Sequence, residues 1–102
     1  MSEGLQDDMR SAVLAEYERA CEEHGERNAS DHESFAVILE EYDEATDESA
    51  DFKKILKEFW NDVKGNDATA WQLDQLKDKA IMAAAEWVQV AAMCHKASVG
   101  KK

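Results

Sequence analysis

Proline is absent from this 102-residue sequence, and glycine occurs only four times. Both residues mark turns and interrupt helices, so their scarcity argues against short strands joined by tight turns. The strong helix formers Ala, Glu and Lys are abundant instead. We therefore expect an all-α protein, and the chain length allows a single domain over residues 1–102 with one modest core.

Cysteines are few, and the sequence has neither a signal peptide nor an uninterrupted apolar run long enough to cross a bilayer. Cys21 and Cys94 lie in apolar stretches near the two ends. A disulfide between them stays open, but a helical chain without secretory features favours reduced, buried thiols. We expect a cytoplasmic protein without membrane contact.

Positive charge is also scarce, because the formal net charge is −11. Bringing such a chain to a nucleic-acid backbone or an anionic membrane costs free energy, so we expect no direct nucleic-acid binding. The charges are unevenly distributed. Residues 1–52 hold 17 acids against 3 Arg, whereas residues 53–102 hold 6 acids against 9 Lys. The first half therefore suits a metal ion and the second an anion.

Apolar side chains recur at helical spacing in four segments, which predicts four helices. Residue pairs such as Ser30 and Glu33 provide capping signals, Gly25 and Gly65 provide stop signals, and a polar stretch at 46–50 is expected to interrupt the chain. The predicted helices span residues 5–24, 31–48, 51–64 and 69–97. They are expected to form a four-helix bundle, and their large apolar surface predicts completion by a homodimer or homotetramer.

The segment 80–94 contains one carboxylate in an otherwise apolar helix. Glu86 and Gln89 are its only polar side chains, and they lie three residues apart on one side. A carboxylate in such surroundings is costly unless it is protonated, hydrogen-bonded or bound to a cation. A structural alternative is a hydrogen bond or salt bridge inside a dimer interface.

A run of acids on the second predicted helix is the other anomaly. Glu41, Glu44 and Glu48 share one stripe, where like charges at i,i+3 and i,i+4 repel each other. A divalent cation would relieve this repulsion, although a solvated acidic face is the simpler alternative. Oxygen ligands without a Cys/His set favour Mg²⁺ or Mn²⁺, which commonly also bind substrate phosphates.

The segments SDHESFAVILEEYDE and AEWVQVAAM resemble the MazG-like nucleoside triphosphate pyrophosphohydrolases, especially short phage and bacterial members. In that family EExxE and ExxD motifs bind Mg²⁺, and the enzymes release pyrophosphate from nucleoside triphosphates. Glu40, Glu41 and Glu44 match the first motif. Glu86 matches the second, whereas Gln89 replaces its Asp. The resemblance covers roughly residues 31–97 and implies a bacterial or phage-infected cell.

The resemblance assigns roles to these residues. Glu41, Glu44 and Glu86 would hold the metal with Gln89 as an outer ligand or hydrogen-bond donor, while Glu40 would orient or deprotonate water. The candidates for phosphate contact are Lys79 and Lys54 first, then Lys53, Lys57 and Lys64.

Two other functions stay open. One is a catalytically impaired relative that binds a nucleotide, because the amide of Gln89 has one negative charge fewer than Asp and should weaken metal binding. The other is an acidic interaction protein that mimics nucleic acid or inhibits a basic partner.

Overall fold

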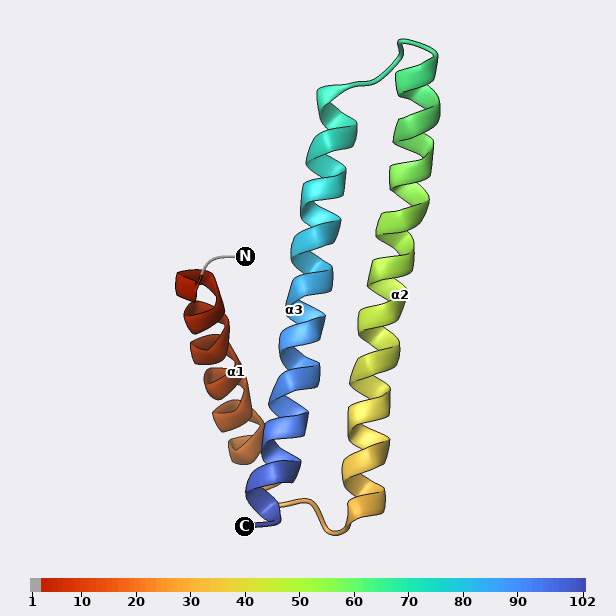
Figure 1. Ribbon diagram of the computed structural model, residues 1–102. Helices are drawn as coiled ribbons and strands as arrows, with labels where there is room; N and C mark the ends of the chain where they lie inside the picture. Colours follow the sequence, from red (N-terminus) through yellow and green to blue (C-terminus); the bar gives the residue numbers. More distant parts are fainter. Residues whose placement is uncertain (1–2) are drawn as a thin grey trace.

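The computed structural model describes residues 3–102 as three long helices (Figure 1). They are α1 (Glu3–His24), α2 (Asp31–Lys64) and α3 (Ala70–Gly100). No strand occurs in this part of the chain, so the all-α prediction is confirmed. None of these helices has the length and apolar character required to cross a membrane.

The predicted break between two helices at residues 46–50 is wrong, because α2 runs through it without interruption. The hydroxyl groups of Thr46 and Ser49 donate to the backbone carbonyls of Asp43 and Ala45 at 3.0 and 2.9 Å. The polar side chains therefore bond within the helix, and neither proline nor glycine interrupts it. The described chain consequently supplies three helices, and a four-helix bundle is not formed within it.

Side-chain caps fix where α2 and α3 begin. Ser30 accepts a hydrogen bond from the backbone N–H of Glu33 at 3.1 Å, while Glu33 accepts one from the N–H of Ala29. At α3, Thr69 and Gln72 form a reciprocal capping box. Such caps satisfy backbone donors that have no partner within the helix, and each contributes about 1 kcal/mol.

Helix α1 packs against α3, its partner at the other end of the sequence. The rings of Tyr17 and His95 meet edge to face at 4.6 Å between centroids. At the end of α1 the chain turns at Gly25, whose φ of +88° lies in the left-handed region that favours glycine. Both cysteines are free, and Cys94 is exposed, so the prediction that both thiols are buried is wrong.

The three helices form a single layer in the order α1, α3, α2 (Figure 1). α2 and α3 are antiparallel along their whole length, whereas α1 covers only the part of α3 nearest its C-terminus. Within residues 3–102, α1 and α2 make no direct helix-to-helix contact. The radius of gyration is 17.2 Å, against about 13 Å for a compact domain of this length.

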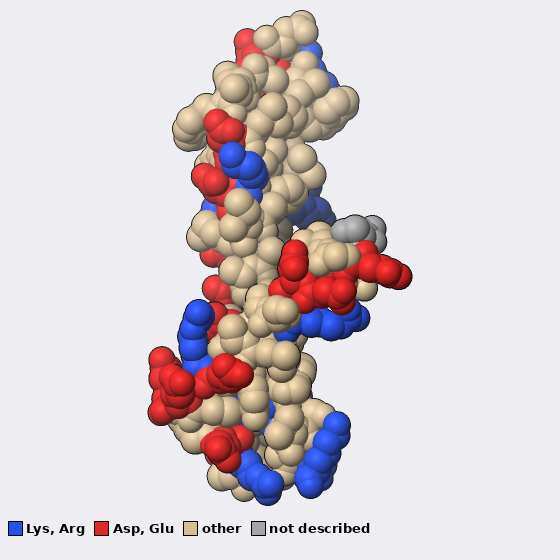
Figure 2. All heavy atoms as spheres, turned by 90° about the vertical axis from the view of Figure 1, so that its left-hand side faces the viewer, with Lys and Arg blue, Asp and Glu red and all other residues tan. Residues whose placement is uncertain are grey.

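A single layer leaves little core. The buried apolar side chains are Ala45, Leu76, Ala92 and Met93, and no large side chain in the described chain is fully buried. Many large apolar side chains are exposed instead, including Phe35 at 67%, Trp60 at 58% and Trp71 at 69%. Figure 2 shows one edge of the layer, where charged side chains gather over α1 and the lower end while uncharged atoms cover much of the upper part.

Candidate functional site

Three of the predicted metal ligands converge where α2 faces α3. Glu41, Glu44 and Glu86 each place one carboxylate oxygen within 4.8 Å of the others. Glu41 and Glu86 are half-buried, whereas Glu44 is exposed. The α2 residues are one helical turn apart, so they meet the α3 residue from the same side. The antiparallel hairpin therefore brings together the residues that the two sequence motifs supply separately.

Two carboxylates of this cluster, Glu41 and Glu86, have raised pKa values. Burial raises the pKa of Glu41, and the charges of Glu44, Glu86 and Glu40 raise it further. Burial likewise raises the pKa of Glu86, followed by the charge of Glu44 and a hydrogen bond with it. The common cause is loss of solvent around carboxyl groups that also repel one another. A cation bound between these carboxylates would offset part of their desolvation and part of their mutual repulsion.

Lys79 pairs with the next acidic side chains along the hairpin, those of Glu48 and Asp51. The Nζ atom of Lys79 lies 3.6 Å from Glu48 and 3.7 Å from Asp51. One carboxylate oxygen of Glu48 is buried without a hydrogen bond, so this ion pair is its compensation. Lys79 was predicted to contact phosphate, and the structure engages it with α2 carboxylates. Lys54, the other predicted phosphate contact, is exposed on α2.

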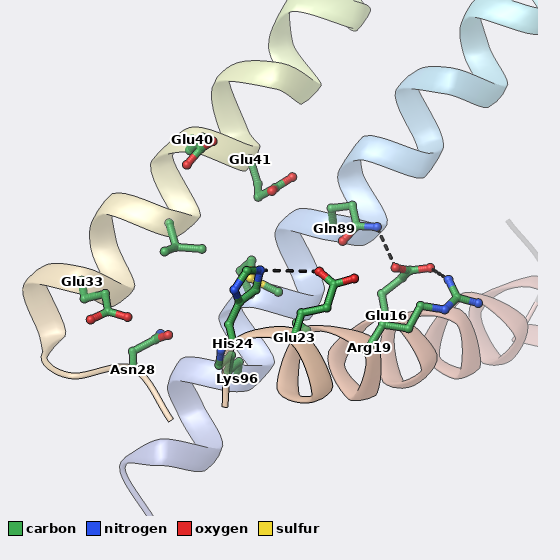
Figure 3. A pocket seen from close by; sticks show the side chains of 13 residues that line it. Glu16, Arg19, Glu23, His24, Asn28, Glu33, Glu40, Glu41, Gln89 and Lys96 are labelled. Carbon is green, nitrogen blue, oxygen red and sulfur yellow. Dashed lines mark hydrogen bonds and ion pairs between the residues drawn. The ribbon is translucent and has the colours of Figure 1, made fainter. Parts of the chain in front are cut away.

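A cleft of about 580 Å³ adjoins the cluster and extends toward α1. Its lining includes Glu41, which also belongs to the cluster, together with Glu40 and Gln89. Figure 3 shows Gln89 directed toward Glu16 of α1, while Glu41 points into the space between α2 and α3. Glu44 and Glu86 do not line it. The cleft therefore meets the carboxylate cluster at one wall, through Glu41.

Gln89 bonds to α1 in this structure. Its side-chain amide nitrogen donates to Glu16 Oε2 at 2.9 Å, and Glu16 also forms an ion pair with Arg19 (Figure 3). Gln89 is not among the three residues whose ligand atoms converge. Neither Glu16 nor Arg19 is predictable as a neighbour of Gln89 from the sequence, because both lie on a helix that is distant along the chain and carries no recognised motif.

Lys96 is the second feature missed from the sequence. It lines the cleft from α3 and is only 4% exposed. It lies three residues after Met93, at the end of the apolar segment, where a lysine resembles an ordinary helix-end residue. A buried ammonium group favours an anionic partner. The cleft is thus lined by carboxylates of both α1 and α2, with Lys96 and Arg19 as the basic side chains among them.

Comparison of the chain with protein-family models, curated proteins and solved structures finds no match. The likeness to MazG-like enzymes therefore depends on the two motifs that Glu40, Glu41, Glu44 and Glu86 match.

Proposed function

We propose that the protein is a Mg²⁺- or Mn²⁺-dependent nucleoside triphosphate pyrophosphohydrolase that converts NTP or dNTP to a nucleoside monophosphate and pyrophosphate. The observation that carries the proposal is the approach of Glu41, Glu44 and Glu86 within 4.8 Å. These oxygen donors suit a hard divalent cation, and their number leaves coordination positions for water and phosphate.

The chemistry divides among the cluster and the cleft. Glu41, Glu44 and Glu86 would hold the metal, which would supply a Lewis acid for the α-phosphoryl group and for the attacking water. Glu40 precedes Glu41 on α2 and lines the cleft, so it is the candidate to orient the water or accept its proton. The water oxygen bonds to the α-phosphorus, the bond from that phosphorus to the bridging oxygen breaks, and pyrophosphate leaves.

Lys96 is the side chain that we assign to the leaving phosphates. It lines the same cleft as Glu40 and Glu41 and is nearly buried. Its positive charge would stabilise the negative charge that develops on pyrophosphate. Lys79 would act indirectly, because its ion pairs with Glu48 and Asp51 hold α2 against α3 beside the cluster.

A nucleotide-binding protein without turnover is the second candidate. The observation in its favour is the hydrogen bond from Gln89 to Glu16. Gln89 occupies the position of a metal-binding Asp in the family motif, and here its side chain bonds to α1 instead. Such a protein would bind Mg²⁺ and nucleotide but release no pyrophosphate. An acidic interaction protein would require neither.

The test is pyrophosphate release from canonical and modified nucleoside triphosphates with Mg²⁺ or Mn²⁺. We expect Glu41→Gln and Glu86→Gln to lower the rate at least 100-fold. Glu58→Gln is the matched control, because Glu58 is exposed on the same helix and lies outside both the cluster and the cleft.

The outcomes separate the candidates. Metal-dependent release that both cluster variants lose supports the enzyme. Nucleotide binding without release from any substrate favours the second candidate. Release that is unchanged in both cluster variants would refute the proposed site.

A further inference from the structure

The α2–α3 hairpin carries an apolar stripe that its own core does not use. On α2 the stripe begins at Phe35 and ends at Val63, with side chains spaced alternately by three and four residues. Each residue of the stripe comes one position after a residue that faces α3. The stripe is therefore turned by about 100° around the helix from the side that faces α3. Its large apolar members, all exposed, are Phe35, Leu39, Tyr42, Leu56, Trp60 and Val63.

Helix α3 extends this stripe into a broad face. Trp87 donates from its indole nitrogen to Ser49 Oγ at 3.3 Å, and its ring meets Tyr42 edge to face at 5.8 Å. Trp87 therefore lies beside the α2 stripe, and Leu73 belongs to the same heptad line of α3 two heptads earlier. We call this combined surface of α2 and α3 the apolar face.

The acidic residues lie on the other side of the layer. Glu40 and Glu44 each come one position before a residue that faces α3. They are therefore turned by about 100° from the side that faces α3, in the direction opposite to the apolar stripe. Glu40 lines the cleft there. The layer is therefore amphipathic, with carboxylates and the cleft on one face and large apolar side chains on the other.

The exposed area exceeds that of a compact globular monomer of the same mass. The accessible surface is 7322 Å², whereas a globular monomer of 11.5 kDa exposes about 5,800 Å². The surplus is about 1,500 Å², while a stable interface buries about 800 Å² on each partner. The surplus is therefore large enough to supply one such interface.

The arrangement of side chains on α2 identifies the partner. Phe35 and Val63 lie equally far from Ser49 along the stripe, and so do Tyr42 and Leu56. A two-fold axis at Ser49 therefore places the apolar groups at one end of the stripe against those at the opposite end of the stripe on a second copy. An interface between identical chains requires this self-complementarity.

Charge selects the orientation of the two copies. Residues 31–51 of α2 contain nine Asp or Glu and no Lys or Arg, whereas residues 52–64 contain four Lys against two acids. Parallel packing would place two strongly acidic segments side by side. Antiparallel packing places the acidic segment of each copy against the basic segment of the other.

We propose that two copies of the chain pack their apolar faces together, antiparallel about a two-fold axis near Ser49, so that their hairpins form a four-helix bundle with both acidic faces outward. The polar centre of the stripe, at Thr46, Ser49 and Lys53, fixes the register of the two copies. This inference depends on the apolar face and not on nucleotide hydrolysis.

Sedimentation equilibrium of the full chain tests the interface. We expect a particle of twice the chain mass, and at least a tenfold weaker association for Leu56→Glu and for Trp60→Glu. Both side chains are about half exposed in the single chain, so the variants should keep their helix content by circular dichroism. Asn61→Glu is the matched control, because it makes the same charge change on the same helix outside the apolar face.

Cysteine cross-linking tests the orientation in a Cys21→Ser, Cys94→Ser background. Antiparallel packing predicts disulfides between Phe35→Cys and Val63→Cys chains when the two variants are mixed. It predicts no disulfide between two copies of the same variant. The two positions are about 42 Å apart along the helix, so parallel packing would give the reverse result. A wild-type monomer at 100 µM, association unaffected by both Glu variants, or cross-links within each single variant would overturn the proposal.

Discussion

Replacing Glu44 by Gln should stabilise the metal-free protein and remove its response to Mg²⁺. Glu44 is the exposed member of the cluster, and its charge raises the pKa of both Glu41 and Glu86. The substitution keeps the size and most of the polarity of the side chain. Its main effect is therefore on the repulsion between carboxylates.

The magnitude follows from the separation of the oxygens. Two unit charges at the cluster's limit of 4.8 Å repel by about 0.9 kcal/mol in water and by about 3.5 kcal/mol at an effective dielectric constant of 20. The lower figure applies because Glu44 is exposed. We expect a gain of about 1 kcal/mol, which raises the melting temperature by about 4–8 °C.

The assay is thermal unfolding with EDTA and with increasing Mg²⁺. Wild type should gain about 2.7 kcal/mol when Mg²⁺ exceeds its Kd 100-fold, so it becomes more stable than the variant. Glu58→Gln serves as the control and should behave like wild type. Two results would refute the reasoning: a variant no more stable than wild type in EDTA, or equal stabilisation of both proteins by Mg²⁺.

Three further expectations concern single groups. Because the pKa values of Glu41 and Glu86 are raised in the folded state, protonation of these two groups stabilises the protein below about pH 4.3, and this stabilisation is lost as pH rises through the raised pKa values. NMR titration of the side-chain carboxyls should show both pKa values above the ordinary range for Glu. Lys79→Met should destabilise the protein by about 1–3 kcal/mol in urea unfolding, since it leaves a buried oxygen of Glu48 without compensation; an unchanged midpoint would contradict this. Gly25→Ala should cost about 1–2 kcal/mol in the same measurement because its φ is +88°, and a neutral effect would show that the turn relaxes.

Periodicity predicted the helical segments, because it depends on local geometry. The resemblance to the MazG-like family, and not local geometry, led us to expect Glu86 near Glu41 and Glu44, since these residues lie on two different helices. The break at residues 46–50 was wrong since polarity alone does not end a helix when hydroxyl groups bond to its own carbonyls. The sequence also gave no means to place Glu16 beside Gln89. That contact joins residues 73 apart along the chain and depends on which helices become neighbours.

The order of the helices in space differs from their order along the chain, and this has a kinetic consequence. α2 and α3 are joined by a short connection and pair along their length, so their contacts form at little cost in loop entropy. α1 makes fewer contacts with α3 than α2 does, so we expect it to dock after the hairpin has formed. It is therefore the unit that opens first under native conditions, and hydrogen exchange should be fastest there. Each opening removes Glu16 and Arg19 from the cleft while the three clustered carboxylates stay together on the hairpin.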